Sequence, residues 1–169
     1  QHPICKSFIV IHMDSDLTLD FIIIIALIVA NGLFSMTELA IVNARKRKLE
    51  EMAKDGNERA KKAFELAENP NQMFSTIQIG ITLVGILTGL YSGATFSGPL
   101  EEVLVSAFPS MATYAASASS FIIVAIITYL SLVIGELVPK RLALNSPESI
   151  AVLVAKPIYW LSVSLKPIV

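Results

Sequence analysis

The chain has 169 residues, of which 54% are hydrophobic and only 16% are charged, and its mean hydropathy is +0.66. A soluble domain usually carries about 25% charged residues, so this deficit indicates an integral membrane protein. The net charge of −1 says little, because membrane proteins distribute charge between the two sides of the bilayer. A single cysteine, Cys5, excludes an internal disulfide framework and a cysteine-rich metal site.

The first twelve residues, QHPICKSFIVIH, differ in character from the rest of the chain. Met13 is followed by DSDLTLDF and then by an apolar run, as the natural start of a protein would be. We therefore interpret residues 1–12 as an extension outside the native protein, within an extracellular tail that covers residues 1–16.

Three segments are long and apolar enough to cross a bilayer, which takes about 20 helical residues each. We place them at about residues 17–43, 73–95 and 117–144. A fourth apolar stretch, residues 147–169, carries two lysines and three prolines. It therefore predicts a juxtamembrane helix at the membrane surface and not a fourth span.

The segment between the first two spans, residues 44–69, is rich in charges of both signs. Its apolar residues recur at helical spacing, and Asp55-Gly56-Asn57 is a typical break, so we predict a helical hairpin outside the hydrocarbon. The interleaved acidic residues and the flanking spans argue against nucleic acid as a partner. Asn69-Pro70 and Ser146-Pro147 each place a capping residue before a proline, which predicts new helices at these points.

The placement of lysine and arginine predicts the topology. Eight of the thirteen basic residues lie in the hairpin, four lie at or beyond the C-terminal end of the third span and one lies in the tail. The loop predicted between the second and third spans, residues 96–116, has none. Because basic residues concentrate on the cytoplasmic side, the hairpin and the C-terminus are predicted inside and the N-terminus outside. The predicted fold class is an all-α integral membrane protein with three transmembrane helices, a cytoplasmic helical hairpin and a C-terminal juxtamembrane interfacial helix.

The third span contains a glutamate, and an ionisable residue inside a span is a functional hypothesis by default. Pro139 lacks the N–H that would bond to the carbonyl of Gly135, so this carbonyl is released beside the Glu136 carboxylate. A carbonyl and a carboxylate together are hard oxygen ligands for Mg²⁺ or Ca²⁺. The alternative is that Glu136 marks the end of the span and pairs with Lys140, four residues on. Spacing alone leaves both interpretations open.

Polar residues on the other two spans lie at a matching depth. Asn31, Ser35 and Glu38 share one face of the first span, and Ser75 and Thr76 lie near the cytoplasmic end of the second. These residues and the glutamate of the third span can therefore meet in one cavity, although a serine can instead bond back to its own helix.

Glycines repeat every four residues along the second span, at Gly85, Gly89 and Gly93. Such small-residue spacing lets membrane helices approach closely. We therefore predict that this face packs against a helix, within the chain or in a dimer.

Three motifs then occur in order: FSMTELAIVNARKRKLE, ENPNQMFSTIQIG and LVIGELVPKR. Over residues 17–169 the sequence resembles the transmembrane domain of the CorC/CNNM (cyclin M) magnesium transporters. The resemblance implies a homodimer in the bacterial inner membrane, and ATP-binding cytoplasmic CBS domains that would follow Val169 and are absent from this chain. It also implies an inward-facing Mg²⁺ site between the three helices. The ligands it implies are Ser35, Ser75 or Thr76, Gly135 through its carbonyl, and Glu136, with Pro139, Asn31 and Glu38 as structural residues of the site.

The function implied is Mg²⁺ transport, as export with coupling to Na⁺. One departure is that Ile81 follows Gly80 where many members have Asn, as in a bacterial branch for which polyamine cargo has been proposed. The alternatives are an exporter of putrescine or cadaverine and a passive dimerising anchor for regulatory domains. An enzyme is not expected, because the spans contain neither an HExxH nor a GxSxG motif.

Overall fold

A computed structural model describes residues 3–165 of the chain, with the side chains of residues 17–164. The described residues form helices and no strand. Three helical segments are long and apolar enough to cross a membrane: Leu17–Asn43, Pro70–Ala107 and Pro109–Asn145. The all-α, three-span prediction is therefore confirmed, and the predicted spans lie inside these longer segments. The chain divides into two compact units, Gln1–Leu27 with Leu87–Thr128 and Ile28–Ile86 with Tyr129–Val169.

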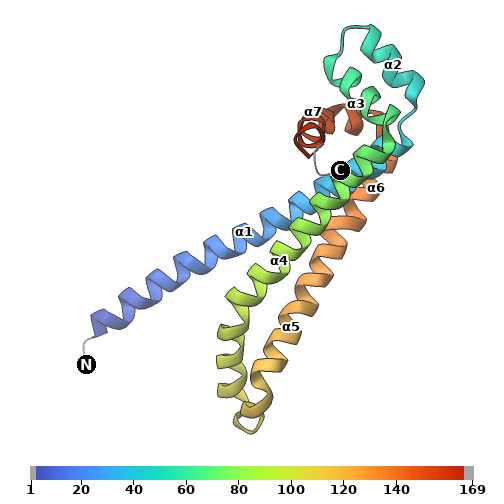
Figure 1. Ribbon diagram of the computed structural model, residues 1–169. Helices are drawn as coiled ribbons and strands as arrows, with labels where there is room; N and C mark the ends of the chain where they lie inside the picture. Colours follow the sequence, from blue (N-terminus) through green and yellow to red (C-terminus); the bar gives the residue numbers. More distant parts are fainter. Residues whose placement is uncertain (1–2, 166–169) are drawn as a thin grey trace. The chain divides into compact units, whose positions relative to one another are not determined.

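Helix α1 runs from Pro3 to Asn43, in blue in Figure 1. Leu17–Asn43 is the part of this helix that is identified as long and apolar enough to cross a membrane among the residues whose side chains are described, and the helix itself extends back to Pro3. The interpretation of residues 1–12 as an extension and of residues 1–16 as an extracellular tail stays a prediction. Residues 1–2 lie outside the described part of the chain.

The predicted hairpin consists of α2 (Lys46–Lys54) and α3 (Glu58–Glu68), which pack on each other (Figure 1). The break falls where Asp55-Gly56-Asn57 predicts it, because Gly56 has a φ of 89°, which glycine adopts at little cost. Asn57 caps α3, since its side-chain oxygen accepts hydrogen bonds from the N–H groups of Arg59 and Ala60 at 3.0 and 3.1 Å.

Helix α4 (Pro70–Ala107) begins at the predicted proline but ends twelve residues beyond the predicted span. The prediction of a loop over residues 96–116 was wrong: after α4 come only the short 3₁₀ helix η1 (Pro109–Met111) and α5 (Ala112–Leu132). A helix satisfies its own backbone and so can continue outside the hydrocarbon. The chain turns at Phe108, whose φ of −135° and ψ of 77° are not helical, because the following proline disfavours the helical region there.

The third span continues from α5 through a π-helical turn, η2 (Val133–Leu137), into α6 (Val138–Asn145). Helix α7 (Pro147–Leu165) begins at the second predicted proline and packs mainly on α3. Its buried face belongs to one apolar core with α1, the hairpin and the start of α4. This core includes Ala40, Ile41, Leu49, Ala63, Leu66, Met73, Ile77, Ala143, Ala151, Val154, Ala155 and Ile158. All of these residues lie in the unit that also holds the candidate site.

Candidate functional site

The first span meets the π-helical turn of the third at close range. A Cβ atom placed on Gly32 would lie 2.9 Å from Cγ of Pro139, and one on Gly135 would lie 3.2 Å from the carbonyl oxygen of Ile28. Gly32, Gly135 and Pro139 are all buried. The two glycines therefore allow a backbone approach that any larger residue would prevent. We call this contact the α1–η2 junction.

The carbonyl of Gly135 is bound at this junction. Its oxygen accepts a hydrogen bond from Nδ2 of Asn31, at 3.2 Å. In the π-helical turn around it, the N–H of Val138 bonds to the carbonyl of Val133, five residues back. Single π-turns occur often at functional sites. The backbone group that Pro139 was predicted to release is thus engaged by a side chain of the neighbouring helix, as burial in a membrane demands.

Two polar atoms of α1 remain without a partner, one on Asn31 at this junction and one on Ser35, four residues along the same helix. Asn31 Oδ1 and Ser35 Oγ are buried, and neither atom has a hydrogen-bond partner among the described residues. Ser35 is only 2% exposed, and its hydroxyl does not bond back to its own helix, which was the alternative left open by the sequence. An unsatisfied buried polar group costs about 1–3 kcal/mol and calls for an explanation such as a missing ligand.

Glu136 adopts the pairing that the sequence left as its second interpretation. Its Oε1 accepts a hydrogen bond from Nζ of Lys140 at 2.7 Å, and the two side chains are 44% and 33% exposed. The carboxylate is therefore reachable from outside the helix packing. Its role as a ligand stays a prediction.

The hydroxyls predicted on the second span differ in burial. Thr76 is fully buried and donates to the carbonyl of Gln72 at 2.9 Å, whereas Ser75 is exposed and donates to the carbonyl of Asn71 at 3.1 Å. Both hydroxyls bond back to their own helix, and which of the two contributes to the site stays a prediction. Glu38, on α1, is half-buried.

One contact near the site was missed by sequence reasoning. A Cβ atom on Gly80 of α4 would lie 2.6 Å from Cε1 of Phe34, the residue before Ser35. The aromatic ring of α1 therefore lies directly against the backbone of α4, and it brings the second span to the helix that carries Asn31 and Ser35. The only sequence signal was that the motif departs from the family pattern immediately after Gly80.

The glycines that repeat along α4 have open space where a side chain would begin. A Cβ atom on Gly85, Gly89 or Gly93 would meet no atom within 4 Å. The packing of this face, within the chain or in a dimer, stays a prediction.

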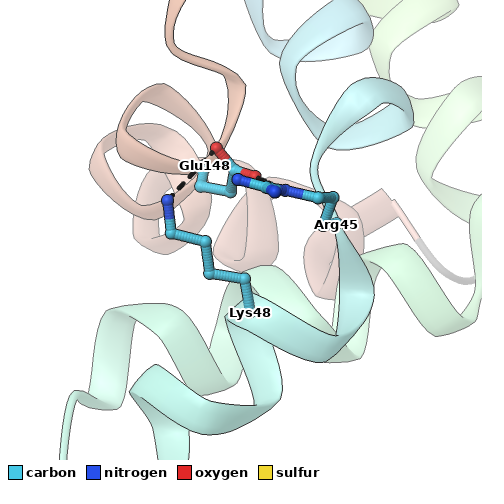
Figure 2. Close-up of polar contacts among 3 residues, drawn as sticks. All are labelled: Arg45, Lys48 and Glu148. Carbon is cyan, nitrogen blue, oxygen red and sulfur yellow. Dashed lines mark hydrogen bonds and ion pairs between the residues drawn. The ribbon is translucent and has the colours of Figure 1, made fainter.

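Outside the spans, an ion pair that sequence reasoning also missed holds the start of α7 (Figure 2). Arg45 Nε donates to Glu148 Oε1 at 2.7 Å, and Lys48 Nζ lies 3.7 Å from Glu148 Oε2. The hydrogen bond from Arg45 lowers the pKa of the buried Glu148 carboxyl below its ordinary value, and the same bond raises the pKa of Arg45. The partners are 103 residues apart, so only the acidic residue in the first turn of α7 hinted at a role.

Together these features define a multi-pass membrane domain whose first and third spans meet at a π-helical turn with unpartnered buried oxygens. Residues 22–169 match the family model of the cyclin M (CNNM) transmembrane N-terminal domain, and the chain belongs to that family.

Curated relatives agree with this assignment. UPF0053 protein sll0260 of Synechocystis sp. is 50% identical over 155 residues, which cover 92% of this chain and 34% of the relative. UPF0053 protein YrkA of Bacillus subtilis is 33% identical over a stretch that covers 85% of this chain and 33% of the relative. The polyamine export protein of Escherichia coli (strain K12) is 31% identical over a stretch that covers 88% of this chain and 33% of the relative. The chain thus spans about a third of the length of these relatives.

Proposed function

We propose that the chain is the membrane domain of a cation transporter, that its cargo is Mg²⁺, and that the ion binds between the three spans beside Glu136. The observation that carries this proposal is the pair of buried, unpartnered oxygens, Asn31 Oδ1 and Ser35 Oγ. Both are hard oxygen donors of the kind that Mg²⁺ prefers. A cation that binds there in part of the transport cycle would compensate the cost of burying them.

The chemistry of the proposed ligand set fits a cargo that must be released again. Among the described residues, no three His, Cys, Asp or Glu side chains cluster, so the site would combine one carboxylate with neutral oxygens. Mg²⁺ usually keeps several of its waters and takes only one or two carboxylates from a protein. The remaining ligands of the ion would come from Asn31, Ser35, Thr76, the Gly135 carbonyl and Glu136. Such a weakly charged site favours transport over permanent storage.

The proposal also covers the orientation of the chain in the membrane, its oligomeric state and the domains that accompany it. The concentration of basic residues in the hairpin and toward the C-terminus supports a cytoplasmic hairpin and C-terminus. The resemblance to the magnesium transporters is what suggests a bacterial inner membrane, export of Mg²⁺ and Na⁺ as the coupling ion. The open glycine face of α4 supports a homodimer. The greater length of the relatives leaves room for cytoplasmic CBS domains beyond this domain.

A second candidate cargo is a polyamine such as putrescine or cadaverine. Relatives at 29–31% identity are named polyamine export proteins. In addition, Glu136 already accepts a hydrogen bond from a primary ammonium, that of Lys140. A passive anchor is the third alternative, and it leaves the unpartnered oxygens unexplained.

The test compares the wild type with Glu136→Gln and Ser35→Ala in calorimetric Mg²⁺ binding and in vesicle flux of Mg²⁺, putrescine and cadaverine. Because an interaction with a charged group is worth about 1.5–3 kcal/mol, we expect each variant to lose about tenfold or more in Mg²⁺ affinity and flux. Glu102→Gln and Ser106→Ala, which change exposed residues of α4, are the matched controls.

Three outcomes would contradict the proposal in different ways. Equal Mg²⁺ binding by wild type and Glu136→Gln would overturn the site. Flux of putrescine or cadaverine without Mg²⁺ flux would replace the cargo. Dimerisation without flux of any of the three would support the passive anchor.

A further inference from the structure

The Glu136 carboxylate is held by a cation that belongs to the protein itself. Lys140 Nζ lies 2.7 Å from Glu136 Oε1, which is a full charge-assisted hydrogen bond. Glu136 lies in the π-helical turn η2 and Lys140 in α6, so the pair crosses the boundary between them. Any cargo cation that uses this carboxylate must compete with the ammonium of Lys140.

The backbone beneath the pair is held in place while the two side chains are not. Pro139, between the two residues, is buried against Gly32, and Gly135 is buried against α1. The side chains of Glu136 and Lys140 remain 44% and 33% exposed. The ion pair can therefore open by rotation of side chains alone, without any movement of the α1–η2 junction.

The ion pair between Glu136 and Lys140 is weak enough for a cargo cation to replace the lysine. A half-exposed ion pair contributes little free energy, so a cargo cation can displace it readily. A carboxylate left without a cation in a membrane span is costly, so the carboxylate needs a substitute whenever cargo is absent. A lysine on a flexible stem, four residues along the helix, can supply that substitute and withdraw again.

We propose that Lys140 is a tethered counter-cation, which occupies Glu136 when cargo is absent, moves aside when cargo binds, and returns as cargo leaves. This inference rests on the proposed function and deepens it. Lys140 is then a positioning residue for Glu136: it weakens cargo binding and speeds cargo release. It also sets specificity, because a cargo cation remains bound only if its total interactions with the site exceed those of the single Lys140 ammonium with Glu136.

The experiment uses Lys140→Met with calorimetry of Mg²⁺ and putrescine and with flux in vesicles. Removal of the competitor should lower the Kd for the bound cation about two- to fivefold, the range that a partly exposed ion pair can supply. The maximal flux should fall, because release becomes slower, and the cargo concentration at half-maximal flux should fall with it. Loss of a merely structural ion pair would weaken binding, so the direction of the change discriminates the two roles.

Four further variants test whether the change in affinity comes from the tethered cation. Lys140→Arg keeps a tethered cation and should behave like the wild type, and Arg141→Met removes an exposed neighbouring charge and should change the Kd less. In the double variant Glu136→Gln/Lys140→Met, the gain in affinity should vanish, because the shared carboxylate is gone. Lys140→Gln repeats the test with a polar side chain in case the methionine impairs folding.

The two ways of failing are separable. Binding by the wild type together with equal or weaker binding by both Lys140→Met and Lys140→Gln would overturn the counter-cation while the proposed function stands. A wild type that binds and moves neither Mg²⁺ nor putrescine would overturn the proposed function, and the counter-cation would fall with it.

Discussion

Two regions of the same compact unit differ in whether their buried or partly buried polar groups have partners. Around the hairpin and α7, the buried Glu148 is bound by Arg45, and Lys62 bonds to Glu65 at 2.9 Å and lies 3.8 Å from the ring centre of Tyr159. On α1, Asn31 Oδ1, beside the α1–η2 junction, and Ser35 Oγ have no partner among the described residues. The first arrangement stabilises the fold, whereas the second retains a cost that a ligand could relieve.

The strongest test of this comparison is to disturb the junction itself. In Gly32→Val, the new side chain would overlap Pro139, because even a Cβ atom would lie 2.9 Å from its Cγ. Overpacking of this kind costs about 1–3 kcal/mol, so we expect a clearly lower Tm in detergent. Gly85→Val is the control, since a Cβ there meets nothing within 4 Å. Equal destabilisation by both variants would show that the junction is no tighter than the open face of α4.

Ser35→Ala should separate stability from function. Removal of a buried hydroxyl without a partner relieves about 1 kcal/mol of desolvation, so Tm should rise by about 2–4 °C while transport falls. Ser92→Ala is the matched control, because Ser92 is also buried but its hydroxyl is already bonded to the carbonyl of Gly89. A lower Tm in Ser35→Ala would mean that the hydroxyl has a partner after all.

Glu148→Gln should act on stability alone. Loss of the ion pair with Arg45 should lower Tm by about 2–4 °C and leave cargo affinity unchanged. Because Arg45 holds the pKa of Glu148 below its ordinary value of 4.5, the stabilisation is present above that pH and is lost as the pH falls through the lowered pKa. The Tm difference between wild type and variant should therefore shrink below pH 4.5. A difference that persists in acid would point to packing and not to charge.

The smallest effect is expected on the outer surface of the hairpin. Glu50 accepts a hydrogen bond from Lys54 at 2.7 Å, and this bond lowers the pKa of Glu50, but both side chains are largely in solvent. Exposed pairs of this spacing contribute little and are screened by salt. We expect the Tm of Glu50→Gln to match that of the wild type within error. A loss as large as that of Glu148→Gln would show that burial does not distinguish the two pairs.

Much of the architecture could be predicted from the sequence because it rests on local properties. Apolar length determined three spans, Gly56 determined where the hairpin turns, and prolines at 70 and 147 determined where α4 and α7 begin. Local reasoning failed at residues 96–116, which were predicted as the loop between two spans, whereas α4 continues through Pro99 to Ala107. A proline near the end of a long helix removes one hydrogen bond and need not end the helix.

The tertiary structure alone decided which of the predicted site residues meet. Asn31 and Gly135 are 104 residues apart, and Arg45 and Glu148 are 103 apart, so no spacing rule links them. The sequence by itself determined that Glu136, Gly135 and Pro139 stand together and that either a cation or Lys140 could hold the carboxylate. The contact of α1 with the π-helical turn decided the hydrogen bonding of the site. Only that contact shows which buried oxygens are satisfied and which still lack a partner.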